Sequence, residues 1–236
     1  MQGRFRYAAM KFFRTTQRAG QAVSTPAEEP AWKQRAVERS TQAAKRRAEQ
    51  RVERFLDAAQ AIMREKGTTD FTVQEVVDRS QQSLRSFYQH FDGKHELLLA
   101  LFEDAMSKCA DQVRIAAAEK STPLERLKTA VQTLFDTSRP DPAAQRPLST
   151  DFALRLLLSH PAEMRVANAP LLALLTDLMT ELKEAGLLRP GFEPRRVAAV
   201  TMQTVMFNAQ SSGQAGAHPI TADEIWNFCA KGLTLS

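Results

Sequence analysis

The side chains best suited to chemistry in this sequence lie between residues 84 and 91, and that chemistry is recognition rather than catalysis. On a helical wheel of about 100° per residue, Arg85 and Gln89 share one face, flanked by Ser86 and Tyr88. A guanidinium can pair with guanine, an amide with adenine, and hydroxyls with phosphate oxygens. The pattern therefore predicts a helix that presents hydrogen-bonding groups to a DNA groove.

Two short helices joined by a tight turn must position this face. Thr72 is placed to begin the first helix, and Glu75 three residues later completes the pattern of a capping box. Ser83 is placed to begin the second helix, whose other face carries Phe87 and Phe91 toward a core. The segment is predicted to be a helix-turn-helix.

A third, longer helix is expected to begin at Asp92 or Gly93. Lys94 in its first turn can join the backbone amides there in holding a phosphate. The residues expected to face the bases are Arg85, Ser86, Tyr88 and Gln89. Thr72, Ser83 and Lys94 are expected to contact the phosphate backbone. Gln82 and His90 complete the predicted DNA interface, and His90 is expected to have a phosphate-binding or structural role.

This segment, roughly residues 50 to 100, resembles the DNA-binding domain of the tetracycline-repressor (TetR) family of bacterial transcription regulators. The matching positions are Thr72, Ser83, Arg85, Ser86, Phe87, Tyr88, His90, Phe91, Lys94, Glu96 and Leu97. The sequence departs from the family pattern at the turn, where Ser80, Gln81 and Gln82 replace the usual Ala-Gly-Val. Without Gly, Gln81 must adopt a backbone conformation that Gly takes more easily.

The resemblance implies an all-α protein with an N-terminal helix-turn-helix DNA-binding domain, followed by a helical ligand-binding and dimerisation domain. The expected division is a partly flexible basic extension over 1–47, the DNA-binding domain over 48–98 and the effector domain over 99–236. In the family, the last two helices, here about 194–211 and 222–233, pair with their twins in a four-helix bundle. The implied function is a ligand-responsive repressor that binds a palindromic double-stranded operator as a homodimer.

Composition agrees with an all-helical soluble protein. The chain has 236 residues, 43% of them hydrophobic, and no apolar run near the ~20 residues that a transmembrane helix needs. Cys109 and Cys229 lie in apolar helical patterns and are expected to be buried thiols in a reducing cytoplasm. The sequence shows no Cys/His metal-binding spacing, no catalytic Ser/His/Asp set, no phosphate loop and no dinucleotide fingerprint. We therefore expect no metal, no cofactor and no enzymatic activity.

The net charge of +5 is concentrated near the N-terminus. Residues 1–51 hold 12 Lys/Arg against 4 Asp/Glu, a net +8, whereas residues 52–236 hold 20 against 23, a net −3. This basic segment either lies over DNA phosphates or is a solvated charged face. Residues 1–27, with five Lys/Arg and no acid, are typical of a membrane-surface or transit-like segment, of a flexible arm, or of a start codon set too far upstream.

The implied effector site has candidate residues but no motif. Large apolar side chains on the later helices either line a pocket for an apolar or acyl-type small molecule or are plain core: Phe135, Phe152, Leu156, Met164, Met179, Met202 and Met206. A helix over 148–160 is apolar nearly all round and is expected to be central. His95 is expected to be solvated, and His160 to be a core or capping residue.

A second function stays open from the sequence. The altered turn at Gln81 and Gln82, and the mildly acidic segment 52–98 with six Lys/Arg and eight Asp/Glu, would also fit a small-molecule-binding or protein-interaction module that has lost specific DNA readout. Retained specific DNA binding would separate the two.

Overall fold

The structure is a computed structural model that describes residues 30–139, 152–211 and 220–234. Over these residues the chain is all-helical, as predicted, and its only β-type contact is an isolated antiparallel bridge between Leu188 and Thr234. The helices are α1 (Ala31–Lys66), α2 (Val73–Ser80), α3 (Leu84–His90), α4 (Lys94–Ala118), α5 (Pro123–Ser138), α6 (Ala153–Ser159), α7 (Pro161–Ala167), α8 (Ala169–Glu184), α9 (Pro194–Ser211) and α10 (Ala222–Leu233). The basic N-terminal segment 1–27 lies outside the described residues.

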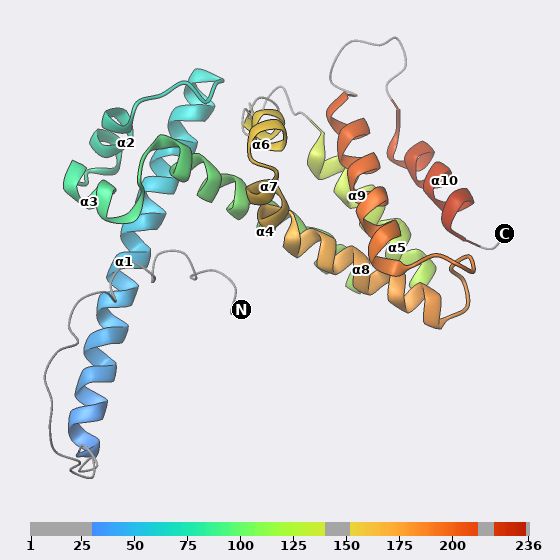
Figure 1. Ribbon diagram of the computed structural model, residues 1–236, viewed down its shortest axis with the longest axis horizontal. Helices are drawn as coiled ribbons and strands as arrows, with labels where there is room; N and C mark the ends of the chain where they lie inside the picture. Colours follow the sequence, from blue (N-terminus) through green and yellow to red (C-terminus); the bar gives the residue numbers. More distant parts are fainter. Residues whose placement is uncertain (1–29, 140–151, 212–219, 235–236) are drawn as a thin grey trace, which may run out of the picture.

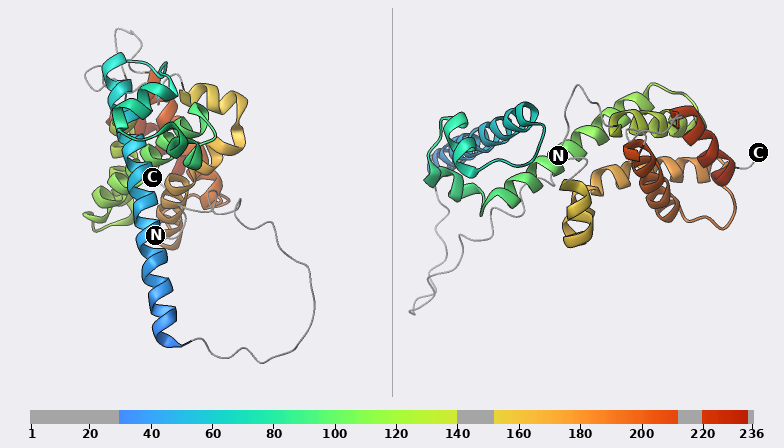
Figure 2. Two further views of the ribbon diagram at one scale, coloured as in Figure 1. Left: turned by 90° about the vertical axis from the view of Figure 1, so that its left-hand side faces the viewer. Right: turned by 90° about the horizontal axis from the view of Figure 1, so that it is seen from above.

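The helices form two lobes connected by α4 (Figure 1). In the N-terminal lobe, α2 and α3 pack beside the second half of α1 and the start of α4. In the C-terminal lobe, α5 packs against α4, α8, α9 and α10. Seen from above, α4 runs from one lobe into the other, and α6 and α7 lie beside it (Figure 2). None of the described helices is both long and apolar enough to cross a membrane.

Each lobe has its own cluster of buried apolar side chains. The N-terminal core joins α1 to α4, and it also includes Phe152, Ala153, Leu156 and Ala167 from the α6–α7 region. The C-terminal core joins the second half of α4 to α5, α8, α9 and α10. Cys109 and Cys229 are reduced thiols buried in the C-terminal core, as predicted. Burial raises the pKa of the Cys229 thiol to about 11.

The basic segment ahead of the N-terminal core continues α1 rather than leading loosely into it. α1 has 36 residues, so at 1.5 Å per residue it is about 54 Å long. Its buried side chains begin at Phe55, and the helix ends at Gly67, whose left-handed φ of 67° closes the cap on Met63. The expected domain boundaries at 47/48 and 98/99 therefore fall inside α1 and α4, and the division stays an interpretation.

The expectation of a central apolar helix over 148–160 is wrong for its described part. α6 has only seven residues, and Leu157 and Leu158 are 54% and 76% exposed. A proline disfavours the α conformation in the residue before it, and His160 accordingly leaves the helix with φ −139° and ψ 60° before Pro161 starts α7. A helix this short buries one face, here on the N-terminal core.

Candidate nucleic-acid interface

α3 presents an open polar face and a closed aromatic one. The side chains of Arg85, Tyr88 and Gln89 are exposed, Tyr88 by 56%, whereas Phe87 on the other side is fully buried. Ser86 lies between the two faces and is half-buried. The division of α3 into a core face and a solvent face, predicted from the sequence, is thus confirmed.

Aromatic contacts hold α3 against α1. The Phe87 ring lies 5.4 Å from Phe55 in an edge-to-face arrangement, 5.4 Å from Phe91 and 5.5 Å from the exposed Tyr88, measured between ring centroids. Edge-to-face rings are a favoured geometry that adds to the effect of burial. Phe87 therefore sets both the depth and the rotation of α3, and with them the direction in which Arg85 and Gln89 point.

The residues predicted to begin the two short helices do so. The Thr72 hydroxyl accepts a hydrogen bond from the Glu75 backbone amide at 3.2 Å. The Glu75 carboxylate in turn accepts a hydrogen bond from the Thr72 backbone amide at 2.8 Å, which completes the capping box. An ion pair with Lys66, followed by the bonds from Thr72, lowers the pKa of Glu75 to about 2. The Ser83 hydroxyl likewise accepts the Ser86 amide at 3.1 Å.

In the turn between α2 and α3, Gln81 adopts the left-handed backbone conformation that a glycine takes more easily. Gln81 has φ 54° and ψ 35°, and among the described residues it is the only non-glycine with positive φ. The neighbouring Gln82 is half-buried, and its side-chain amide donates to the Gln81 carbonyl at 3.2 Å. The turn is therefore formed without Gly, at the cost of a left-handed backbone in a residue with a Cβ.

Two buried polar atoms on α3 have no hydrogen-bond partner among the described residues: Ser86 Oγ and His90 Nε2. Burial, and secondly the positive charge of Arg51, lower the pKa of His90 and so favour the neutral form of its imidazole. A neutral imidazole offers a hydrogen bond rather than a charge to a phosphate.

Lys94, at the start of α4, is engaged within the protein. Its ammonium lies 3.6 Å from the Asp70 carboxylate and 4.8 Å from the centroid of the Phe71 ring. Asp70 is almost fully exposed, so this ion pair is weak and exchangeable with a phosphate. At the same helix start, the Asp92 amide donates to Glu96, which occupies the place that an anion would take.

The first half of α1 is an exposed basic rod. Over residues 31–51 the helix would be about 30 Å long, and it projects away from both lobes (Figure 1). Its basic side chains are all exposed: Lys33, Arg35, Arg39, Lys45, Arg46, Arg47 and Arg51. We call this segment the basic rod.

The seven candidate effector residues do not come together. Phe135, Met179 and Met202 are buried in the C-terminal core, with Met206 packed against it. The other three, Phe152, Leu156 and Met164, belong to the N-terminal core because α6 and α7 pack on the first half of α4. A single lining made of all seven is thus absent from the described structure, and the effector site stays a prediction.

Sequence reasoning treated His95 and His160 separately, and it missed their proximity. His160 does stand at a helix cap, but its side chain is exposed rather than part of a core. Its ring centroid lies 4.7 Å from that of His95, and Glu163 lies beside both. The two histidines are 65 positions apart in the chain, and no local spacing could have signalled this cluster.

Comparison with known proteins agrees with this geometry. Residues 55–101 match the family model described as bacterial regulatory proteins, tetR family. The transcriptional regulator FadR from Bacillus subtilis, in complex with stearoyl-CoA, has a TM-score of 0.62 at 18% identity over 76% of this chain and 98% of that chain. FadR from Bacillus halodurans scores 0.58 at 21% identity, over 77% of this chain and 98% of its own. A tetR-family regulatory protein from Rhodococcus RHA1 scores 0.55 at 16%, over 79% and 98%.

No curated protein sequence matches the chain. At these identities the solved structures show the fold alone, and they extend the likeness from the N-terminal lobe to the helices of the C-terminal lobe. The matched segment 55–101 begins at the buried Phe55, includes all of α2 and α3, and ends on α4 at the buried Leu101. The family model thus matches residues 55–101 to the bacterial regulatory proteins of the tetR family, and the solved structures show that the fold of the chain is similar to theirs.

Proposed function

We propose that this protein is a ligand-responsive transcriptional repressor that reads a palindromic operator as a homodimer in the cytoplasm. The observation that carries the proposal is the exposed polar face of α3, held on a rigid aromatic core. A reading helix must keep its base-contacting groups accessible while its orientation stays constant, and α3 satisfies both conditions.

In this proposal Arg85 and Gln89 read bases in the major groove. They are exposed and lie one turn apart on α3, so both can reach neighbouring base pairs. Arg pairs bidentately with guanine and Gln with adenine. The residues proposed to contact DNA around them are Thr72, Gln82, Ser83, Ser86, Tyr88, His90 and Lys94.

The basic rod would supply attraction that does not depend on sequence. Its length of about 30 Å is close to one turn of the double helix, and its basic residues outnumber its acidic ones by seven to two. Each phosphate that Lys or Arg neutralises releases counterions, so binding by the rod should weaken steeply with salt.

The homodimer is supported by largely exposed apolar side chains on the last two helices. Val200 and Phe207 on α9 and Phe228 on α10 are 63%, 71% and 69% exposed. α9 and α10 lie side by side at one end of the C-terminal lobe (Figure 1), and a second copy related by a two-fold axis would cover these groups. Two-fold symmetry of the protein implies a two-fold symmetric operator.

The effector is proposed to be an apolar or acyl-type small molecule bound in the C-terminal lobe. The similar FadR structure from Bacillus subtilis holds stearoyl-CoA. Met179, Met202 and Met206 in and beside the C-terminal core are flexible thioethers that can rearrange around an apolar ligand. A ligand that binds best to a conformation in which the two α3 helices no longer match the spacing of the half-sites would lower the affinity of the protein for the operator.

The test is selection of bound sites from a random DNA pool by the full-length protein. We expect an enriched palindrome for the wild type, and for Arg85→Ala a loss of preference at one position in each half-site with about 1–3 kcal/mol weaker binding. The control is Arg114→Ala, which removes an exposed arginine on α4, away from α3, and should leave the selected sequence unchanged. Salt-sensitive binding without any enriched sequence would instead favour the module that has lost DNA readout.

A further inference from the structure

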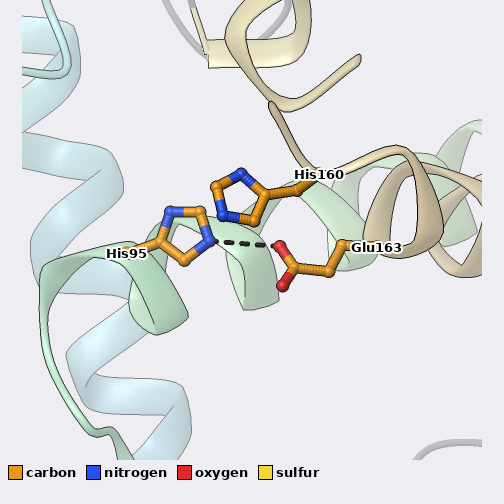
Figure 3. A group of neighbouring side chains, drawn as sticks. All are labelled: His95, His160 and Glu163. Carbon is orange, nitrogen blue, oxygen red and sulfur yellow. Dashed lines mark hydrogen bonds and ion pairs between the residues drawn. The ribbon is translucent and has the colours of Figure 1, made fainter. Parts of the chain in front are cut away.

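A cluster of three potential ligands lies where α6 and α7 pack on the first half of α4. It consists of His95 in the first turn of α4, His160 between α6 and α7, and Glu163 in the first turn of α7 (Figure 3). His95 Nε2 lies 3.1 Å from Glu163 Oε2, and the three ligand atoms all lie within 4.8 Å of one another. The side chains come from segments that are far apart in sequence, so the fold alone creates the cluster.

The residue types match the preferences of zinc-like ions. Imidazole nitrogens and carboxylate oxygens bind Zn²⁺ at about 2.0–2.2 Å, and two histidines with one glutamate form a three-ligand site that leaves a fourth position for water. Tetrahedral ligand atoms at those bond lengths are about 3.3 Å apart. His95 and Glu163 already have this separation. The ligand atom of the exposed His160 lies up to 4.8 Å from the other two. Rotation of its side chain would shorten these distances by up to about 1.5 Å, to the tetrahedral separation.

The packing beneath the cluster keeps its members together. The Phe152 ring lies 5.9 Å from the His95 ring and 6.3 Å from Phe102, centroid to centroid, so an apolar floor joins α6 to α4. Phe152 and Phe102 are both buried in the N-terminal core. The backbones that carry His95 and His160 are therefore set by core packing, and only side-chain rotation remains to be ordered when an ion binds.

We propose that His95, His160 and Glu163 form a binding site for one divalent transition-metal ion of the zinc type. The bound ion ties the first turn of α4, directly after the reading helix, to the junction of α6 and α7. Metal binding itself does not depend on the function proposed above. Its consequence for operator affinity does rest on that function.

The experiment is a titration of the full-length protein with Co²⁺, a spectroscopic substitute for Zn²⁺, followed by competition with Zn²⁺. We expect saturation at one ion per chain, with visible d–d absorption and no thiolate charge-transfer band, because both cysteines are buried elsewhere. We expect at least tenfold weaker metal binding for each of the variants His95→Gln, His160→Gln and Glu163→Gln. Loss of a group that only supports a metal ligand already weakens binding by about 10–100-fold. Asp111→Asn, which changes an exposed carboxylate sixteen residues beyond His95 on α4, should bind as the wild type does.

Failure of the proposal is equally specific. Absence of saturable Co²⁺ absorption in the wild type, or equal affinity in the wild type and in a His95→Gln/His160→Gln double variant that melts normally, would overturn the site. Operator binding is measured separately, with and without a chelator. A protein that binds metal as expected but selects no DNA sequence would disprove the proposed function and leave the metal site standing.

Discussion

The turn between α2 and α3 offers a direct measure of backbone strain in the N-terminal lobe. Gln81 occupies the left-handed region with φ 54°, in the place where the TetR-family pattern has Gly. For a residue with a Cβ this conformation costs about 1–2 kcal/mol. A glycine there would remove this strain, but it would lose about 0.5–1 kcal/mol more conformational entropy on folding. The net prediction for Gln81→Gly is a gain of about 0–1.5 kcal/mol, with a midpoint of about 0.75 kcal/mol.

The variants Gln81→Ala and Gln81→Asn make the prediction sharper. The Gln81 side chain is exposed, and the hydrogen bonds at the turn use its backbone, so truncation to Ala keeps both the strain and these bonds. Asn tolerates the left-handed region better than most residues. The expected order of stability is Gly, then Asn, then Gln and Ala together.

The assay must report on the N-terminal lobe, because the two lobes have separate cores and need not unfold together. Native-state hydrogen exchange of the amides in α2 and α3 gives the free energy of opening in that lobe. If Gly raised this free energy no more than Ala does, the strain assigned to Gln81 would be refuted. A gain confined to the C-terminal lobe would refute it as well.

Three further predictions follow from the N-terminal lobe and the basic rod. Phe87→Ala should destabilise the protein by about 3–5 kcal/mol, measured by denaturant unfolding, because it empties a fully buried site; a loss below about 1 kcal/mol would show that the site collapses freely. Replacing Arg46 and Arg47 by Gln should make DNA binding less sensitive to salt. The slope of log K for DNA binding against log salt concentration should fall in magnitude by about 0.9 for each phosphate that the basic rod no longer neutralises, and an unchanged slope would show that the rod does not contact DNA. Because its pKa is lowered to about 2, Glu75 stabilises the fold above its unfolded pKa, and this contribution disappears as the pH falls toward 2. Glu75→Gln keeps an acceptor for the cap but should show a smaller loss of melting temperature over that acidic range; an identical pH profile would contradict the assignment.

Local features of this protein could be predicted from the sequence because neighbours along the chain make them. The capping box of Thr72 and Glu75 forms from residues three positions apart, and it is present. The two faces of α3 follow from helical periodicity in the same way. The strained turn at Gln81 could be foreseen because the need for positive φ is a property of one residue.

The features that sequence reasoning missed depend on contacts between distant segments. The apolar pattern around Leu157 and Leu158 indicated burial, but burial also requires a neighbour on every side, and α6 packs on one face only. The candidate effector residues fell into two cores for the same reason. The cluster of His95, His160 and Glu163 arises from the packing of α7 on α4, which no pattern within either segment encodes.

The position of α4 has a consequence for how an effector could act. Its first half is buried in the N-terminal core through Leu97 and Leu101, and its second half in the C-terminal core through Val113 and Ala117. A 25-residue helix is about 37 Å long and rigid, so a displacement at one end must repack the other core as well. To shift the population of two such packings from 1:99 to 99:1, an effector needs about 5.5 kcal/mol of preference for one of them. A ligand that only fills space in the C-terminal core leaves the reading helices in place, whereas one that changes the packing of α4 against α6 and α7 acts at the His95 end, next to α3. In the proposed repressor, the α4–α7 contact is therefore where the sensitivity of operator binding to an effector should be greatest.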